Sequence, residues 1–431
     1  MRFSFDKSKI YYSILIITLS AFFLFFYIIW GEYKKIRKIN SNLSFIEFIK
    51  YSSDQLLNST FQNKRIKITE RQNYINIFDK NFRDKGYILF SGYDDKVGTA
   101  VTKIYSLKNN QIIHKWIPPI DDIHKITPTY TSEYNLKKNY RMQHPLLTKK
   151  GELIFGSGEG PIAKINSCSK LIWAIDRQFH HSIEYYKNDL ITVPIVINNT
   201  ERFKYPILNH GYAIVDISSG KIVSEHSVID ILEKSKYIGL LYGVGEFEYD
   251  RIHLNDAEII RNSDNFFLEG DVMLSSKHLS TVFVYRPSTK KIIWLKTGPW
   301  LNQHDVDYLG DGKFSIYGND TFRYNKVQTY DVFYSSNNIY HYDYPKNEIK
   351  KIYINNMKNI KTPTQGLHKI LKNEDLFIEE TDNFKIHRFG KNEKRWDFVN
   401  LIDKNKLGSI HWSRYLDENT NLDWLNFSSC N

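Results

Sequence analysis

The chain of 431 residues is 42% hydrophobic and 15% aromatic, which is enough apolar material for a buried core and excludes a disordered protein. A large part of the formal net charge of +11 lies in residues 1–40, where seven lysines and arginines stand against two acidic residues. Because the remaining excess is spread along the chain, we expect no nucleic-acid partner.

An uncharged segment of twenty residues, Tyr11–Trp30, follows a short basic tail of residues 1–10. At ~1.5 Å per residue a helix of this length spans about 30 Å, the thickness of the hydrocarbon core of a membrane. A cleavable signal peptide is the alternative, but the apolar stretch is longer than in such peptides and no small-residue cleavage site precedes Gly31. We therefore predict a single transmembrane helix over residues 11–30 that stays on the chain as an anchor.

Residues 31–80 form a predicted connector behind this segment. Ser44 and Glu47 have the spacing of a capping box, and apolar residues among them predict a short helix from Ser44 towards Leu57. Basic residues flank the apolar segment on both sides, so the positive-inside rule favours a cytoplasmic C-terminal side only slightly.

A pattern of paired β-strands recurs six times after residue 80. Each repeat ends in an alternating hairpin with a polar turn, and a shorter strand pair precedes it. The hairpins are residues 101–116, 162–175, 212–226, 282–296, 339–353 and 384–398. Four short strands per repeat predict an all-β fold, a six-bladed β-propeller over residues 81–400, with residues 401–431 as a C-terminal extension. A β-sandwich is the alternative, but it would need fewer strands and would not explain six repeats.

Two features lie outside this repeat pattern. The longest insertion, residues 228–250, begins with a helix-like segment and predicts an element at the rim of the fold or a lid. The two cysteines, Cys168 and Cys430, fit no zinc spacing or disulfide framework, and we expect both to be unpaired thiols.

Polar side chains recur just before the first strand of five repeats. They are Gln143-His144, His180-His181, Asn255-Asp256, Gln303-His304 and Gln365-Gly366. In a propeller these positions surround one mouth of the central channel, so the side chains are expected to converge. Three interpretations are open: the histidines satisfy backbone groups at strand ends, several imidazoles ligate a metal ion, or one histidine is a covalent nucleophile while the others bind an oxyanion.

The order of several motifs resembles a known family. The motifs are His180-His181, His253-Leu254-Asn255, Ser275-Ser276-Lys277-His278, the hairpin Val282–Trp294, and Gln303-His304 with Tyr317-Gly318-Asn319-Asp320 downstream. Over roughly residues 85–400 the chain resembles the bacterial arylsulfate sulfotransferases, which are six-bladed propellers that use no nucleotide sulfate donor. The resemblance implies transfer of a sulfuryl group from a phenolic sulfate ester to a phenolic acceptor through a sulfated histidine.

The same resemblance implies roles for single residues. His304 corresponds to the nucleophile, and His181, His253 and Asn255 would hold the sulfate oxygens or move the phenolic proton. Lys277 would complete the anion site where the family pattern has arginine, and a lysine keeps the charge but lacks the planar fork of arginine. The predicted substrate-binding set also includes His180 and Thr364, and we expect no metal and no cofactor.

Two other functions are carried as alternatives. The first is a catalytically altered, membrane-anchored propeller that binds an anionic or glycan-like ligand or a partner protein at the same mouth. The second is a metal-dependent enzyme that uses the histidine cluster. The resemblance favours export, so we expect a single-pass protein of the inner membrane with the propeller on the periplasmic side; the oligomeric state is left open.

Overall fold

The computed structural model describes residues 7–39, 45–46, 65–129, 136–186, 189–197, 207–243, 248–323, 331–333, 336–391 and 393–426. The chain divides into two compact units, which are treated separately here. One unit comprises residues 1–64 with 323–334, and the other comprises residues 65–322 with 335–431.

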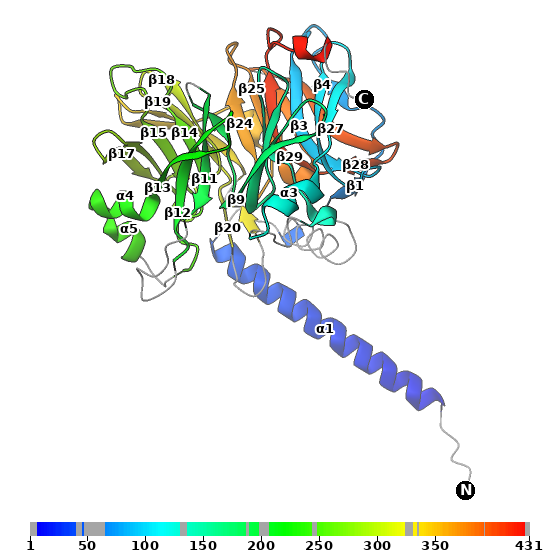
Figure 1. Cartoon of the computed structure of the whole chain (residues 1–431). Coiled ribbons are helices and arrows are strands. Elements are labelled where there is room, and N and C mark those ends of the chain that lie inside the picture. The colour runs from blue at the N-terminus through cyan, green and yellow to red at the C-terminus, as the bar shows by residue number, and fades with distance from the viewer. Residues whose placement is uncertain are drawn as a thin grey trace. The chain divides into compact units, whose positions relative to one another are not determined.

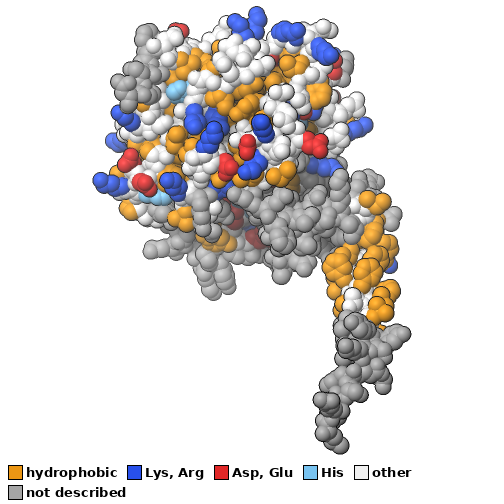
Figure 2. Space-filling view, turned by 90° about the vertical axis from the view of Figure 1, so that its right-hand side faces the viewer, with side chains coloured by type: hydrophobic (Ala, Val, Ile, Leu, Met, Phe, Trp, Pro, Cys, Tyr) orange, Lys and Arg blue, Asp and Glu red, His pale blue; other side chains and the backbone are white. Residues whose placement is uncertain are grey.

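Helix α1 (Lys7–Ile39) lies in the first unit and contains the apolar segment noted in the sequence (Figure 1). Its hydrophobic side chains, such as Phe22 and Phe25, are exposed and form an apolar surface (Figure 2). Among the described residues no helix is both long and apolar enough to cross a membrane, so the predicted transmembrane helix is not confirmed. The short helix predicted from Ser44 lies outside the described residues, except for Phe45 and Ile46, which are helical.

The second unit is built mainly of antiparallel β-strands (Figure 1), which confirms the predicted all-β fold. The strands form six groups of four, which we number one to six in chain order. Group one has β29 (Ile410–Leu416), β3 (Tyr87–Asp94), β4 (Thr99–Ser106) and β5 (Gln111–Trp116). Group two has β6 (Gln143–Leu147), β7 (Leu153–Gly156), β8 (Gly160–Ile165) and β9 (Leu171–Phe179). Group three has β10 (Glu184–Tyr185), β11 (Leu190–Val196), β12 (His210–Asp216) and β13 (Ile222–Ser227).

The remaining groups repeat this order. Group four has β14 (Leu254–Ile259), β15 (Val272–Ser276), β16 (Thr281–Arg286) and β17 (Lys291–Thr297). Group five has β18 (Val306–Gly310), β19 (Lys313–Gly318), β22 (Asn338–Asp343) and β23 (Glu348–Ile352). Group six has β24 (Leu367–Ile370), β25 (Leu376–Glu380), β26 (Lys385–Phe389) and β27 (Lys394–Asp403).

Short elements complete the fold. Strands β1 (Ile66–Ile68), β2 (Ile75–Ile77) and β28 (Lys406–Gly408) extend group six at β27. Two more short strands are β20 (Thr321–Arg323) and β21 (Asp331–Phe333). Among the described residues of this unit, the α-helices are α3 (Ile120–Ile126), α4 (Val228–Lys234), α5 (Ile238–Tyr242) and α6 (Ile354–Met357), and the 3-10 helices are η2 (Lys137–Asn139), η3 (Thr381–Asn383) and η4 (Asp423–Asn426).

The six hairpins predicted from the sequence are all present as the third and fourth strands of a group. Five of them contain a register shift at the corresponding place, for example between Val284 and Tyr285. The groups are separate sheets except for two and three, which a single bridge between Phe179 and Ile195 joins. The repeats are therefore equivalent structural units.

The C-terminal part of the chain completes group one. Strand β29 pairs with β3 over Ile410–Leu416 and Tyr87–Gly92, so residues placed in a C-terminal extension by the sequence belong to the sheet system. Without β29 the long buried strand β3 would expose an unpaired edge. The two ends of the domain are thereby held in one sheet.

Apolar cores lie between each group and the next, and one lies between group six and group one. Leu89 with Phe155 packs one against two, and Phe90 with Phe377 packs six against one. The interfaces of two with three, three with four, four with five and five with six have cores of their own. Each sheet is consequently buried on both faces.

The insertion after group three forms two short helices. Ser227 caps α4 by accepting the amide of Asp230 at 3.2 Å, and α4 buries Val228, Ile231 and Leu232 against groups three and four. The helix expected at the start of this insertion is thus confirmed.

One expectation about the cysteines is wrong. Cys168 is disulfide-bonded and is not an unpaired thiol. Cysteine spacing did not indicate this bond, because separation along the chain does not report distance in the fold.

Candidate active site

Four residues that precede or begin a first strand have left-handed backbone conformations. The φ angles are 51° at His144, 57° at His181, 45° at His253 and 59° at Gln365. This conformation costs a non-glycine residue about 1 to 3 kcal/mol and is retained where the surrounding structure requires it. The same backbone conformation thus recurs at or near the start of the first strand in four groups.

Imidazole rings from four groups meet at this point. The ring centroid of His181 lies 5.2 Å from that of His253, 5.9 Å from that of His304 and 6.5 Å from that of His144. The structure therefore brings together the histidines that repeat alignment placed at one mouth. We call His144, His181, His253 and His304 the histidine cluster.

The proton positions on His304 follow from its neighbours. Asn319 donates its amide hydrogens to the carbonyls of Thr362 at 3.0 Å and Gln365 at 2.8 Å, which turns its Oδ1 towards His304. That oxygen accepts a hydrogen bond from Nδ1 of His304 at 2.6 Å, and the amide of Gln365 donates to Nε2 at 3.1 Å. His304 is thus the tautomer with its proton on Nδ1 and a lone pair on Nε2.

Burial keeps the cluster neutral. Burial lowers the pKa of His304 well below its usual value, and the positive charge of Lys277 lowers it further. The pKa of His181 is lowered in the same way, first by burial and then by neighbouring histidines. Burial lowers the pKa of His253 to about 4, although its hydrogen bond to Asp250 acts in the opposite direction. At neutral pH these imidazoles are uncharged and have lone pairs available.

Asp250, a carboxylate outside the repeat pattern, orients two histidines, His253 and His210. Asp250 accepts hydrogen bonds from Nδ1 of His253 at 2.5 Å and from Nε2 of His210 at 2.8 Å. Burial alone would raise the pKa of Asp250, but these two hydrogen bonds hold it well below its usual range. Asp250 is therefore an anion that fixes the tautomers of both rings.

The hydrogen bonds continue from His210 into the cluster. Nδ1 of His210 lies 2.9 Å from Nε2 of His180, and Nδ1 of His180 lies 3.0 Å from Nδ1 of His181. Because Nε2 of His210 donates to Asp250, Nδ1 of His210 accepts from Nε2 of His180. Nδ1 of His180 in turn accepts from Nδ1 of His181. The Nε2 atoms of His181 and His253 are consequently left as acceptors.

The other residues proposed from the sequence, Asn255, Lys277 and Thr364, differ in how they contact the cluster. Asn255 is fully buried, donates to the carbonyl of Gln303 at 3.0 Å and has no hydrogen-bond partner for its Oδ1. The amide of Lys277 donates to the carbonyl of His253 at 3.0 Å, which places this cation next to the cluster. Thr364 donates its amide to Asp382 at 3.3 Å, so the residue of its loop that contacts His304 is Gln365.

Sequence analysis missed three contributors. Asp250 lies in the insertion, and His210 begins β12, the third strand of group three. Repeat alignment therefore brings neither residue to the cluster. Asn319 was named only as part of a motif and was given no role in the site, yet it contacts His304 directly. Its place in the motif Tyr317-Gly318-Asn319-Asp320, directly after β19, was the one available signal.

Among the residues that the structure describes, two groups of His, Asp and Glu side chains lie close enough together to hold a metal ion. In the first, His210, Asp250 and His253, the nitrogens that face the carboxylate already donate hydrogen bonds to it. A metal there would have to displace both protons, so the arrangement suits a hydrogen-bonded relay better than a metal site. The second group, Asp305, Asp307 and His368, lies in the cavity described next.

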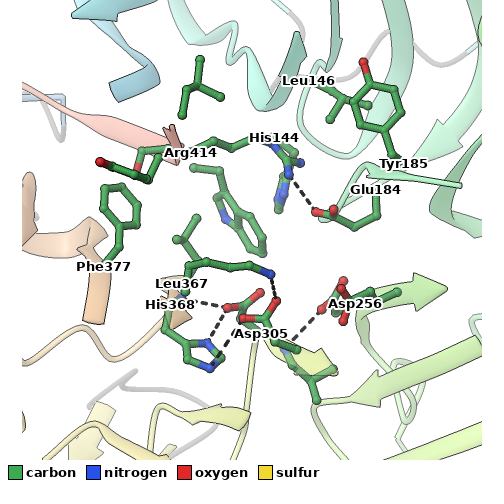
Figure 3. Close-up of a pocket in the computed structure, with 18 of the residues that line it drawn as sticks. His144, Leu146, Glu184, Tyr185, Asp256, Asp305, Leu367, His368, Phe377 and Arg414 are labelled. Atoms are coloured by element: carbon green, nitrogen blue, oxygen red, sulfur yellow. Dashed lines mark hydrogen bonds and ion pairs between the residues drawn. The ribbon is translucent and has the colours of Figure 1, made fainter. Parts of the chain in front are cut away.

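A cavity of about 300 Å³ adjoins the histidine cluster at His144 (Figure 3). Its lining includes residues from the first strands of all six groups, β29, β6, β10, β14, β18 and β24. The ring of His144 packs on Trp412 with centroids 3.2 Å apart, at the boundary of cavity and cluster.

Fold and site define an all-β protein whose candidate active site is assembled from the starts of several first strands. Residues 143–400, more than half of the chain, match the arylsulfotransferase (ASST) family, and the chain belongs to that family. Membership supports a sulfotransferase-like function in general. None of the curated proteins matches the chain. A solved structure of a protein of unknown function from Bacteroides caccae is similar, with 12% identity, a TM-score of 0.47, and coverage of 77% of this chain and 99% of that chain.

Proposed function

We propose that the protein transfers a sulfuryl group from an aryl sulfate ester to a phenolic acceptor through a sulfated His304. The observation that carries this proposal is the state of His304, a neutral imidazole with its Nδ1 proton held by Asn319 and a cation, Lys277, nearby. Covalent catalysis by histidine needs such a lone pair, and transfer of an anionic group needs a fixed positive charge beside it. Family membership supports the same reaction class.

The proposal includes a closed six-bladed propeller. Three observations support it: six apolar cores that run from each group to the next and back to group one, the pairing of β29 with β3, and one cavity lined by all six first strands. In such a ring each group is a blade and the histidine cluster lies at one mouth of the central channel.

In the first half of the reaction, Nε2 of His304 attacks the sulfur of the aryl sulfate. The new nitrogen–sulfur bond forms as the bond from sulfur to the phenolic oxygen breaks, and the phenolate leaves as an anion beside Lys277. Asn319 stabilises the charge that develops on the ring by accepting from Nδ1. The amide of Gln365 must leave Nε2 for this step and is then free to bind a sulfuryl oxygen.

In the second half, an acceptor phenol attacks the sulfur and the bond from sulfur to His304 breaks. The phenolic proton passes to Nε2 of His253, whose Nδ1 proton is held by Asp250 at 2.5 Å. A carboxylate in this position fixes the tautomer of the base and stabilises the imidazolium that forms. His253 later returns the proton to a departing phenolate or to solvent, so that the cycle is balanced.

A steady-state assay tests the proposal. The full chain is given 4-nitrophenyl sulfate with and without phenol, and release of nitrophenol is followed by absorbance. We expect turnover that depends on the acceptor and ping-pong kinetics, with His304→Gln inactive and a control variant on β22, His341→Gln, active. Folded protein that releases no nitrophenol under any of these conditions would contradict the proposal.

A non-catalytic anion-binding protein is the second candidate function. It is favoured by one observation, namely that the lone pair of His304 is occupied by the Gln365 amide while the side chain is only 2% exposed. Under this alternative an aryl sulfate binds at the cluster without release of nitrophenol, and equilibrium dialysis with the same compound detects that binding.

Attachment to the inner membrane with the propeller on the periplasmic side stays a proposal. It is supported by the exposed apolar side chains of α1 and by the disulfide at Cys168, because disulfides persist in oxidising compartments. Fractionation of cells with protease accessibility is the test. Full-length protein in the cytosolic fraction would contradict both parts.

A further inference from the structure

A row of three hydrogen-bonded imidazoles ends at Nε2 of His181, an atom that the proposed reaction does not use. Nδ1 of His181 donates to Nδ1 of His180 at 3.0 Å, and Nε2 of His180 donates to Nδ1 of His210 at 2.9 Å. Nε2 of His210 donates to Oδ1 of Asp250 at 2.8 Å. Every proton in this row points towards the carboxylate, so Nε2 of His181 carries a lone pair. We call His181, His180 and His210 the imidazole row.

The lone pair of His181 is an unsuitable partner for an anion. The ring of His181 lies 5.9 Å from that of His304, on which the sulfuryl group is carried in the proposed reaction. The oxygens of a sulfate ester accept hydrogen bonds, and two acceptors that meet without a proton between them cost free energy. His181 therefore interacts favourably with the anion only when its Nε2 carries a proton.

A positive charge on the ring of His181 itself is unfavourable. Burial lowers the pKa of this ring, and the histidines that face it, His180, His253, His304 and His144, act in the same direction. Lys277 adds a fixed positive charge close to two of them, His304 and His253. The one carboxylate at the cluster, Asp250, pairs with His210 and His253 and not with His181. A proton on Nε2 of His181 thus requires that the charge be held on another ring.

We propose that an aryl sulfate binds at the histidine cluster together with one proton from solvent, and that the imidazole row converts His181 from an acceptor into a donor. The proton adds to Nε2 of His181, and the Nδ1 proton of that ring moves to Nδ1 of His180. The Nε2 proton of His180 then moves to Nδ1 of His210. Only N–H bonds are made and broken, and each of these two transfers runs along a hydrogen bond of 2.9 to 3.0 Å.

The added charge comes to rest on His210, beside a carboxylate. His210 keeps its Nε2 proton, gains one on Nδ1, and forms an ion pair with Asp250 at 2.8 Å. Asp250 is ionised at neutral pH, because its hydrogen bonds outweigh the effect of burial on its pKa. A carboxylate in this position stabilises an imidazolium. His181 and His180 stay neutral, and the anion gains an N–H donor without a charged ring at its side.

Two other histidines near Asp250 are alternative carriers of the added proton. Nδ1 of His253 donates to Oδ2 of Asp250 at 2.5 Å, and Nδ1 of His278 lies 3.9 Å from the same oxygen and donates to the backbone carbonyl of Asp250. Burial lowers the pKa of both rings, and the charge of Lys277 opposes their protonation. The experiments therefore have to distinguish His210 from these two rings.

The inference rests on the proposed function, because the anion is taken to be an aryl sulfate, but it concerns binding and requires no transfer. Benzenesulfonate separates the two, since its sulfur is bonded to carbon and is not transferred to a histidine. A protein that binds benzenesulfonate with a proton but releases no nitrophenol from 4-nitrophenyl sulfate would contradict the proposed reaction alone.

Titration calorimetry of the full wild-type chain with benzenesulfonate is the first test and needs no variant. Measurements in two buffers that differ in ionisation enthalpy give the number of protons taken up on binding, and a pH series gives the affinity. Because the sulfonate does not itself titrate near neutral pH, we expect uptake of about one proton and an affinity that falls about tenfold for each pH unit. Binding without proton uptake, an affinity independent of pH, or no binding at millimolar benzenesulfonate would each overturn the proposal.

Variants of the imidazole row give the second test. His210→Gln removes the ring that holds the charge, so we expect no proton uptake and affinity at least about tenfold weaker at low pH. His181→Gln supplies an amide donor that needs no proton, so we expect binding whose affinity no longer varies with pH. The controls His278→Gln and His341→Gln are expected to take up the proton as the wild type does. A folded His210→Gln protein that still takes up one proton, or loss of uptake in His278→Gln alone, would overturn the proposal.

Discussion

The histidine cluster and the carboxylate-lined cavity are built from neighbouring residues of the same strands, yet burial acts on them in opposite directions. His304 precedes Asp305, and Asn255 precedes Asp256. Burial lowers the pKa of His304 and raises the pKa of Asp305 and Asp256, because it disfavours the charged form of each group. One region therefore offers neutral imidazoles with lone pairs, while the other holds carboxylic acids that burial keeps protonated.

The largest effect is expected from removing the lone pair of His304. His304→Gln keeps a polar side chain but has no nucleophilic nitrogen, so we expect a loss of more than about 1,000-fold in aryl sulfate turnover. Turnover measured beside His341→Gln separates this effect from general damage. Activity within tenfold of the wild type in His304→Gln would show that the nucleophile lies elsewhere.

The second change removes the cation beside the cluster. Lys277→Gln is expected to lower kcat by about 100- to 1,000-fold, because a fixed charge then no longer stabilises the transferred anion. Lys277→Arg keeps the charge and is expected to be at least as active as the wild type. If both variants lose activity equally, Lys277 acts through packing and not through charge.

The third change concerns Asp250, the carboxylate that accepts hydrogen bonds from His253 and His210. Asp250→Asn is expected to lower the rate of sulfuryl transfer to the acceptor by about 100-fold, while the first release of nitrophenol changes little. Rapid-mixing measurements of the burst and of the steady state separate the two steps. A loss confined to the burst would place Asp250 in the first half of the reaction.

The smallest expected effect is on stability against pH, where the two regions have opposite signs. Burial raises the pKa of Glu258 to about 8, so the folded state binds its proton more tightly than the unfolded state and stability is lost as pH rises towards 8. Buried His181 and His304 have lowered pKa values, so their contribution is lost as pH falls below about 6.5. Each group contributes a slope of at most about 1.4 kcal/mol per pH unit.

Denaturant unfolding between about pH 7.5 and 8 isolates the acids, since in that range the histidines are almost wholly neutral in the unfolded state as well as in the folded state. We expect the free energy of unfolding of the wild type to fall as pH rises, and Glu258→Gln to show a shallower slope. Equal slopes in the two proteins would mean that Glu258 ionises in the folded state as it does in solution.

Local patterns explain which parts of the fold could be predicted. The six hairpins were predicted because alternation and turn residues act over a few positions, and the histidine positions followed from aligning those repeats. The pairing of β29 with β3 joins segments more than 300 residues apart and has no local signature. Strand spacing alone could not show that the C-terminal residues complete group one.

The candidate site could also be predicted only in part. The sequence indicated His181, His253 and His304. In the structure the ring centroids of His253 and His304 lie 5.2 Å and 5.9 Å from that of His181. It did not indicate Asp250 or His210, because their link to the cluster depends on an insertion and on a strand outside the aligned positions. The carboxylates of the cavity were also missed as a group, since they are spread over groups three, four and five and only the fold brings them together.

Intact-mass analysis of the full chain after brief exposure to 4-nitrophenyl sulfate tests the sulfated histidine most directly. We expect a gain of about 80 Da, one sulfuryl group, which disappears on addition of excess phenol and is absent from His304→Gln. Peptide mapping then locates the group on His304. Folded wild-type protein that releases nitrophenol without any adduct, or an adduct that persists in His304→Gln, would contradict the proposed covalent mechanism.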